Sequence, residues 1–317
     1  MRNRSQEVER QLLAGYEEGR YGLEDIVRYA VTTVGGRWLE AEPIILEMGT
    51  DSVDYALQVL KGRWEEVEPS IMCSSRTAAE YAARVLQRRW PAAESIIMER
   101  PSVAVDYARD VIHGRWPEAE QAIARYSSAA VDYAHTVIHG RWPEAEPFIM
   151  QNAWGSVDYA IKVLKTRWPE AEQVILQGGP VCAVIYAQEV LDERWLEAEP
   201  TIMPSSTAAV IYAKNVIRGR WPEAEASIAS GADDNFWSEL FGGDERVNYA
   251  TQVLPGNWDE EVARKCSCWL YYYAKDFIGG KLPAQLHNRM LMFGMENESD
   301  QWVKRYFRLE QVSEVRS

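Results

Sequence analysis

The sequence is poor in cysteine and contains no long hydrophobic run. Its four cysteines, Cys73, Cys182, Cys266 and Cys268, form no CxxC pair, and so few thiols are typical of a reducing compartment rather than a disulfide framework. No stretch of about 18 apolar residues occurs, so no transmembrane helix is predicted. Residues 1–20 are charged and lack the apolar core of a signal peptide. We therefore expect a cytoplasmic protein without membrane contact.

Basic residues are in the minority. The chain has 34 Lys and Arg against 48 Asp and Glu, for a net charge of -14. This balance argues against direct nucleic-acid binding, which needs cations to displace the phosphate counterions, and against docking on anionic lipid. A basic protein partner is the better match, although the charge also serves solubility.

Recognisable catalytic motifs are lacking too. There is no P-loop, GxGxxG, HExxH or GxSxG motif, the patterns that carry phosphate binding, metal binding or acyl transfer. His135 and His139 stand four residues apart, as metal ligands on one helix face do, but no other ligand cluster accompanies them. We interpret them as solvated histidines and predict no enzyme, no metal site and no cofactor.

What the sequence does contain is a repeat of 26 residues. Eight tryptophans recur at this period, with one interval of 27: Trp38, Trp64, Trp90, Trp116, Trp142, Trp168, Trp195 and Trp221. Nine residues before each stands a tyrosine that is followed by alanine: Tyr29, Tyr55, Tyr81, Tyr107, Tyr133, Tyr159, Tyr186 and Tyr212. Arg precedes every one of these tryptophans, Glu follows four residues later and Ile seven later. Fixed periods of 20 to 50 residues indicate repeat architectures.

The pattern within a repeat predicts two short helices, which we name A and B. Around Tyr107 the residues Val105, Ala108 and Val111 fall on one helical face, and Trp116 opens a second apolar stripe. The fold class predicted is therefore all-α, an α-solenoid of about ten helix-turn-helix repeats with terminal caps. The predicted parts are an N-terminal capping helix (1–20), eight regular repeats (21–230), an insertion loop (231–245), and two degenerate repeats with a C-terminal cap (246–317).

The two degenerate repeats keep only part of the frame. Tyr249 and Trp258 preserve the nine-residue spacing, and in the last repeat Tyr273 holds the tyrosine place. Lys281 and Leu282 there replace the arginine and the tryptophan. Degraded end repeats are typical of solenoid caps.

Glycine and proline punctuate each repeat. Gly114 and its equivalents suit the left-handed residue that closes a helix, and we expect another exit geometry or strain where Arg88, Thr166 and Glu193 replace it. A proline also stands five residues after Trp in four repeats, as Pro147 does, which is too deep for a helix that begins at the tryptophan. Helix B therefore begins with a tight turn or starts later than the tryptophan.

The invariant residues predict a structural ladder, represented by Tyr107, Trp116, Arg115 and Glu120. Buried aromatic side chains supply the core, and the arginine is expected to tie neighbouring repeats together through carboxylates. A row of charges that grips a ligand is the alternative. Strict repetition favours the structural interpretation, because a specific ligand site should vary along the array.

The variable positions predict the partner surface. Two or six residues after the repeat tyrosine stand Lys61, Gln87, Arg109, His113, His135, His139, Lys165 and Arg218, mostly cationic. Cations also suit the ends of helix dipoles, which is the alternative explanation. Trp154 and Trp237 lie outside the repeat frame and suit aromatic anchors for a partner, although Trp237 also suits a local core patch.

Regular acidic positions support a second hypothesis. Asp54, Asp106, Asp132 and Asp158 precede their tyrosines, and seven of the eight regular repeats carry two glutamates after the tryptophan for one arginine before it. A rod with evenly spaced negative charge could imitate a nucleic acid. Solubility and helix capping are the alternative explanation, and a reader of nucleic-acid bases through successive A helices is a further one.

The YA and RWPEAE elements resemble the short two-helix repeats of uncharacterised proteins in large tailed bacteriophages. The resemblance covers residues 21–230 and implies an α-solenoid that manipulates host proteins in the host cytoplasm, with no functional residue to carry over. The sequence thus predicts a non-catalytic protein–protein interaction scaffold, a phage-encoded inhibitor or adaptor. An acidic nucleic-acid mimic or nucleic-acid-binding repeat protein is the alternative. The oligomeric state stays open.

Overall fold

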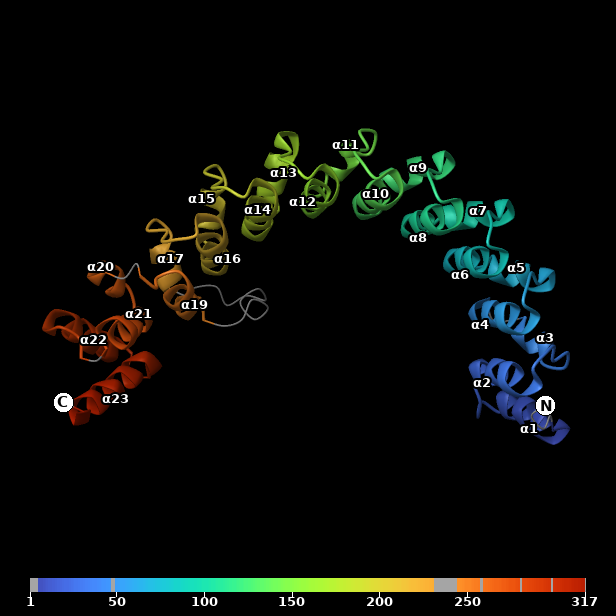
Figure 1. Cartoon of the computed structure of the whole chain (residues 1–317), viewed down its shortest axis with the longest axis horizontal. Helices are drawn as coiled ribbons and strands as arrows, with labels where there is room; N and C mark the ends of the chain where they lie inside the picture. The colour runs from blue at the N-terminus through green and yellow to red at the C-terminus, as the bar shows by residue number, and fades with distance from the viewer. Residues whose placement is uncertain are drawn as a thin grey trace. The chain divides into compact units, whose positions relative to one another are not determined.

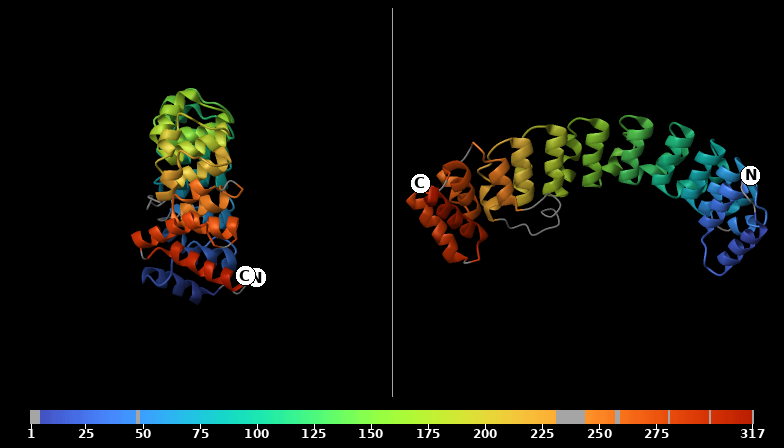
Figure 2. Two further views of the ribbon diagram at one scale, coloured as in Figure 1. Left: turned by 90° about the vertical axis from the view of Figure 1, so that its left-hand side faces the viewer. Right: turned by 60° about the horizontal axis from the view of Figure 1, so that its bottom comes forward.

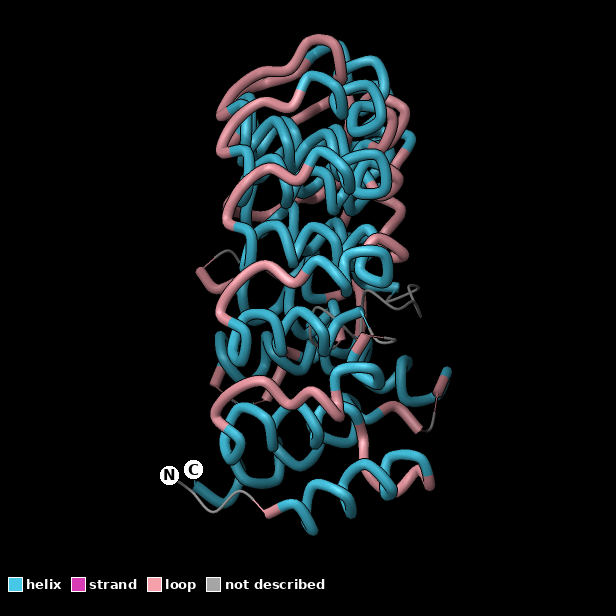
Figure 3. The backbone as a smooth tube through the Cα atoms, turned by 90° about the vertical axis from the view of Figure 1, so that its right-hand side faces the viewer, coloured by secondary structure: helices cyan, strands magenta, loops and turns pink. Residues whose placement is uncertain are grey.

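The computed structural model describes residues 5–46, 49–230, 244–256, 259–279, 281–297 and 299–316, with side chains to Glu310. Every described segment is helix or loop (Figure 3), which confirms an all-α helical-repeat solenoid. The chain divides into two compact units, residues 1–151 and 152–317. Within each unit the A helices lie side by side in one row and the B helices in a second row (Figure 1 and Figure 2).

The A helix of each regular repeat has two parts. An α-helix of seven residues ends at the repeat tyrosine, and a π-helix of five residues follows. The alanine after the tyrosine has no exposed surface in any regular repeat, so no larger side chain fits there. In the first unit these helices are α2 (Leu23–Tyr29) with η1 (Ala30–Val34), α4 (Gly49–Tyr55) with η2 (Ala56–Leu60), α6 (Ser75–Tyr81) with η4 (Ala82–Leu86), α8 (Pro101–Tyr107) with η5 (Ala108–Ile112), and α10 (Ser127–Tyr133) with η6 (Ala134–Ile138).

The second unit continues the pattern as far as its last repeats, where the helix around Tyr249 has no π-helical part. Its A helices are α12 (Ala153–Tyr159) with η7 (Ala160–Leu164), α14 (Pro180–Tyr186) with η9 (Ala187–Leu191), α16 (Ser206–Tyr212) with η10 (Ala213–Ile217), α19 (Glu245–Gln252), and α21 (Ser267–Tyr272) with η11 (Tyr273–Ile278). Trp258 lies outside the described residues.

The B helices start at two different places. α7 and α9 begin at the proline directly after the tryptophan. In the repeats with the deep proline the α-helix starts later, at the glutamate before that proline. α13 and α17 also start at the glutamate, although they have no deep proline. Pro147 is then the second residue of its helix, where the missing N–H has no carbonyl to reach. The B helices are α3 (Glu42–Ile45), η3 (Glu65–Val67) with α5 (Glu68–Ile71), α7 (Pro91–Met98), α9 (Pro117–Ala124), α11 (Glu146–Ile149), η8 (Pro169–Ala171) with α13 (Glu172–Gln177), α15 (Glu199–Ile202), α17 (Glu225–Ser230), α20 (Glu260–Ala263) and α22 (Ala284–Glu296).

The exit from the A helix differs from the expectation. The left-handed residue is the one before the glycine, His113 in the fourth repeat with φ 58°. Gly114 comes next, has no positive φ, and donates its amide N–H to the carbonyl of Ala108 at 3.2 Å. This bond spans six residues, one more than the 6→1 bond of a Schellman motif. Repeats with Arg88, Thr166 or Glu193 at the glycine place leave the helix in the same left-handed way, so the different geometry expected for them was wrong.

Aromatic pairs form the core of the array. Trp116 is fully buried and Tyr107 is 1% exposed, and their ring centroids lie 5.1 Å apart with planes tilted by 49°. The same pair recurs in all eight regular repeats with centroids 5.0 to 5.4 Å apart. Tilted rings at this distance are a favourable aromatic geometry.

Within both units, a tyrosine hydroxyl ties a repeat to the one before it. The backbone N–H of Trp116 donates to the Tyr133 hydroxyl at 2.6 Å, and that hydroxyl donates to Glu120 Oε1 at 3.1 Å. Burial raises the pKa of Tyr133 to about 12. The same bond joins Trp38 to Tyr55, Trp64 to Tyr81, Trp90 to Tyr107, Trp168 to Tyr186, Trp195 to Tyr212 and Trp221 to Tyr249.

The arginine of the ladder binds within its own repeat. Arg115 donates from Nε and Nη2 to the two oxygens of Glu120, at 2.7 and 2.8 Å, and this pairing lowers the pKa of Glu120. The prediction that the arginine itself ties neighbouring repeats together was wrong for this contact. Geometry explains the difference, because the tyrosine of the next repeat reaches the same carboxylate from the other side.

The single 27-residue interval is absorbed in one loop. Gly178 and Gly179 follow α13, and Gly179 has φ 91°, a conformation that glycine adopts without strain. A Cβ on Gly178 would stand 2.4 Å from Cβ of Ala153. The bond from the amide of Trp168 to the hydroxyl of Tyr186 is kept at 2.6 Å, so the extra residue leaves the ladder intact.

The two ends are closed by longer helices, α1 (Gln6–Glu17) and α23 (Gln301–Arg316). At the C-terminal end Tyr306 imitates the repeat tyrosine, because its hydroxyl accepts the amide N–H of Leu282 at 3.2 Å. Lys281 forms an ion pair with Glu310 at 2.6 Å. The last repeat therefore keeps the tie although it has lost the tryptophan and the arginine.

Candidate functional site

Six residues predicted for partner binding share one backbone position. Each is exposed, follows the π-helical part of its A helix and has φ between 51° and 58°. They are Lys61, Gln87, His113, His139, Lys165 and Arg218. A left-handed conformation costs a non-glycine residue about 1–2 kcal/mol, so these positions carry backbone strain as well as exposed side chains.

The histidines act locally. Nδ1 of His113 lies 3.0 Å from the carbonyl oxygen of Arg109, and Nδ1 of His139 lies 3.1 Å from that of His135. A ring N–H donated there satisfies a carbonyl at the helix end. His139 has left the helix, so it does not share a helical face with His135. Among the residues that the structure describes, no group of three His, Cys, Asp or Glu could hold a metal ion.

Two of the predicted cations are paired with acids. Arg109 is exposed and bonds to Asp106 and Asp110, at 2.8 and 2.7 Å. Arg218 forms an ion pair with Asp192 of the preceding repeat. A partner that bound either guanidinium group would have to compete with these carboxylates for it.

Of the two tryptophans outside the repeat frame, Trp154 lies in a described helix. Trp154 is the second residue of α12 and is 43% exposed, so a large part of its ring is open to solvent. Trp237 lies outside the described residues.

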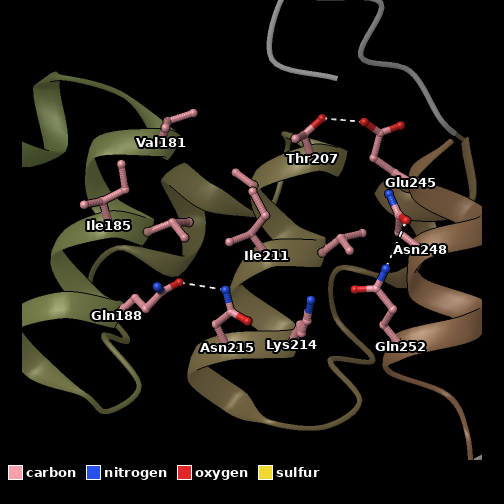
Figure 4. A pocket seen from close by; sticks show the side chains of 13 residues that line it. Val181, Ile185, Gln188, Thr207, Ile211, Lys214, Asn215, Glu245, Asn248 and Gln252 are labelled. Atoms are coloured by element: carbon pink, nitrogen blue, oxygen red, sulfur yellow. Dashed lines mark hydrogen bonds between the residues drawn. The ribbon is translucent and has the colours of Figure 1, made fainter. Parts of the chain in front are cut away.

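The second unit contains an apolar groove between neighbouring A helices, which we name the A-helix groove (Figure 4). Its volume is about 370 Å³, and it is formed by α14 with η9, α16 with η10, and α19. Val181, Ile185 and Ile211 are partly exposed in it. Volumes of 300–1,000 Å³ are typical of ligand sites.

Amide side chains border the isoleucines. Asn215 Nδ2 donates to Gln188 Oε1 at 2.7 Å across two repeats, and Gln252 Nε2 donates to Asn248 Oδ1 at 3.2 Å on the next helix. Lys214 is exposed beside them. Figure 4 shows Gln188, Asn215, Lys214 and Gln252 at one end of the groove, with Asn248 between Gln252 and Glu245.

A buried carboxylate stands at the other end (Figure 4). Glu245 is 7% exposed and accepts a hydrogen bond from the Thr207 hydroxyl at 2.7 Å. No Lys or Arg within the described ranges comes within 4.0 Å of its oxygens. The groove therefore presents an acid, an apolar floor and a set of amides.

The corresponding grooves of the first unit are charged. One of about 350 Å³ lies between α6 with η4 and α8 with η5, and it is lined by Glu80, Arg84, Asp106, Arg109 and Asp110. Arg84 crosses to Asp54 of the preceding repeat at 2.7 Å. These acids and bases neutralise one another, which leaves little unpaired charge for a ligand.

The sequence contained a signal for the A-helix groove that went unused. The residue before the repeat tyrosine is charged in the first six repeats, from Arg28 to Asp158, and is Ile185 and then Ile211 in the next two. This break in the consensus places isoleucine where five of the other repeats have an acid. Asn248 holds the same place before Tyr249 in the next repeat. Glu245 could not be assigned to the groove from the sequence, because the repeat pattern does not predict which side chains of neighbouring repeats meet.

Comparisons with known proteins return no relative: no family model, no curated protein and no solved structure matches the chain. In the described part of the chain, no helix has the length and apolar character needed to cross a membrane.

Proposed function

We propose that the protein is a non-catalytic scaffold for protein–protein interaction, and that the A-helix groove is its partner-binding site. The resemblance of its repeats to those of bacteriophage proteins suggests an inhibitor or adaptor that acts on a host protein in the cytoplasm.

One observation carries the proposal. The buried aromatic pair is the same in every regular repeat, and the bond between tryptophan amide and tyrosine hydroxyl recurs within both units, while the surface of the A helices changes. It changes at Ile185 and Ile211, where an apolar side chain replaces the acid that five other repeats have. Apolar side chains left partly exposed in a groove are typical of a protein-binding surface.

The experiment compares capture of bacterial lysate proteins by the wild type and by a double variant, Ile185→Asp with Ile211→Asp. Aspartate stands at this place in four other repeats, so the variant should fold. The matched control, Gln173→Asp with Ala226→Asp, adds the same charge to exposed positions of α13 and α17 in the same unit.

A stoichiometric protein that survives nuclease treatment, binds the wild type and the control, and is lost by the groove variant supports the scaffold. Equal capture by all three proteins contradicts the assignment of the groove.

The acidic alternative is supported by a row of glutamates two residues after the tryptophan. Seven of the eight regular repeats have an exposed glutamate there: Glu40, Glu66, Glu118, Glu144, Glu170, Glu197 and Glu223. The arginine is already held by the other glutamate of its repeat, as Arg115 is by Glu120, so each such repeat contributes about one net negative charge to this row.

Charge density weighs against mimicry of duplex DNA. Packed helices are about 8–10 Å apart, which spaces the net charges of successive repeats by roughly that distance. B-DNA carries one charge per about 1.7 Å, roughly five times more. If the captured proteins were DNA-binding proteins that duplex DNA displaced, the mimic would replace the scaffold.

A further inference from the structure

The A-helix groove contains a negative charge that the described chain leaves without a cation. Glu245 is almost fully buried and has the Thr207 hydroxyl as its hydrogen-bond donor. Lys214 lines the same groove but forms no ion pair with it. A buried carboxylate without a paired cation is costly, so a positively charged ligand group that reached Glu245 would gain more than it would at an exposed acid.

The amides of the groove match a peptide main chain. The amides form two pairs, Asn215 with Gln188 and Gln252 with Asn248. In each pair one amide N–H donates to the oxygen of the other amide, and that is the one hydrogen bond between them. A primary amide has two N–H donors and an oxygen with two lone pairs, so each pair retains groups that can bond a peptide N–H or C=O. The fourth and fifth repeats have Arg109 and His135 two residues after the tyrosine where the seventh has Gln188, so this groove is chemically distinct from theirs.

The size of the groove suits an extended segment. It reaches from α14 across α16 to α19, which is two helix spacings or about 16–20 Å. An extended chain covers about 3.3 Å per residue, so roughly five or six residues would cross it. Ile185 stands on α14 at the start of that path, and Ile211 stands on α16 near its middle (Figure 4).

We propose that the A-helix groove binds an extended peptide segment of a basic protein, with an aliphatic side chain against Ile185 and Ile211 and a Lys or Arg paired with Glu245. The net charge of -14 favours the approach of such a partner. This inference rests on the proposed scaffold function and names the chemistry of its partner.

The probe is an array of octapeptides in which Arg and Leu are placed at every pair of positions, with Gly and Ser elsewhere. Binding of the full-length protein is followed by fluorescence anisotropy for the best peptide and for three relatives, with Arg→Gln, Leu→Ser or both changes. We expect affinity only when both residues are present, at a preferred separation.

Three protein variants locate the binding. Glu245→Gln keeps the acceptor for Thr207 and removes the charge, so affinity for the Arg peptide should fall about tenfold or more while that for the Arg→Gln peptide stays unchanged. Ile185→Asp with Ile211→Asp should abolish binding of all peptides. The Gln173→Asp and Ala226→Asp control should bind as the wild type does, and far-ultraviolet circular dichroism checks that each variant is folded.

The outcomes separate this inference from the proposed function. Binding that ignores the Arg→Gln change or the Glu245→Gln variant overturns the role of Glu245. If no peptide binds but a captured lysate protein is still lost by the isoleucine variant, the scaffold stands and the extended-peptide inference falls. If neither a peptide nor a lysate protein depends on the isoleucines, both fall. Self-association that the isoleucine variant abolishes, seen by analytical ultracentrifugation, would identify a second copy as the occupant and overturn the inference.

Discussion

Replacing Tyr133 by phenylalanine should weaken one junction of the array and leave the aromatic core in place. The change removes only a hydroxyl, which accepts the Trp116 amide at 2.6 Å and donates to Glu120 at 3.1 Å. The ring pair with Trp142, with centroids 5.0 Å apart, is retained.

The expected cost follows from the two lost bonds. The Trp116 N–H becomes a buried donor without a partner, which costs about 1–3 kcal/mol, and loss of the bond to a charged acceptor adds to this. Glu120 keeps both bonds from Arg115, so the carboxylate remains compensated. We expect a total loss of about 2–4 kcal/mol.

The loss should be local, because each repeat of a solenoid contacts only its neighbours. Hydrogen exchange read at single amides is therefore the assay, and it reports the free energy of local opening. The Trp116 amide and its neighbours should exchange roughly 30-fold faster or more. Amides of the first two repeats should be unaffected.

The matched control is the same change at the first repeat. The hydroxyl of Tyr29 is buried, and no hydrogen-bond partner for it exists among the described residues, because no earlier repeat supplies a tryptophan amide. Its ring pairs with Trp38 at 5.4 Å as in the other repeats. Tyr29→Phe should therefore be neutral or slightly stabilising. If both variants lost stability equally, the tie through the hydroxyl would not be what holds neighbouring repeats together.

Three further predictions concern the backbone and pH. Lys165→Gly should raise the midpoint of urea unfolding, because glycine relieves the strain of a φ of 54°; the net gain is about 0.5–1 kcal/mol after the entropy cost of glycine. Gly35→Ala, at φ 68°, should lower the midpoint. If both variants shifted the midpoint in the same direction, these left-handed positions would not be strained. Leu196→Pro, at a 64% exposed position where the fifth repeat has Pro143, should stabilise by about 0.4–1 kcal/mol in the same assay, and a loss would show that this backbone does not suit proline. The folded pKa of the ladder tyrosines is raised above the unfolded value, so stability should be constant below about pH 10 and fall as the pH rises toward 12; absorbance near 295 nm should then show them ionising together with unfolding, and early ionisation in the folded state would contradict their burial. The tyrosines raised to about 12 are Tyr55, Tyr107, Tyr133, Tyr186 and Tyr212.

The repeat made the fold class predictable. Positions that recur at a fixed interval must occupy equivalent environments, so one repeat read correctly describes them all. In the four repeats with a deep proline, that proline also predicted the later start of the B helix, because a residue without an amide donor belongs in the first turn of a helix. Pro147 in α11 confirms that interpretation.

The predictions that were wrong concern a backbone conformation and a side-chain contact, which the spacing of residues in the repeat does not determine. Gly114 was chosen as the left-handed residue because glycine adopts that conformation most easily, yet the π-helical end puts His113 there instead. Arg115 was expected to reach the next repeat, and it folds back onto Glu120. Both outcomes depend on how the chain turns between A and B.

What the sequence by itself determined is the array: two helices per repeat, the buried aromatic pair and the acidic surface. These follow from periodicity and composition, which are properties of the chain. What only the tertiary structure decided is which side chains of different repeats meet. It brought Ile185, Ile211 and Glu245 into one groove, where Thr207 bonds the carboxylate and none of the described ion pairs includes it. Such a juxtaposition depends on the packing of three successive A helices, one of which follows an irregular stretch that the repeat period does not describe.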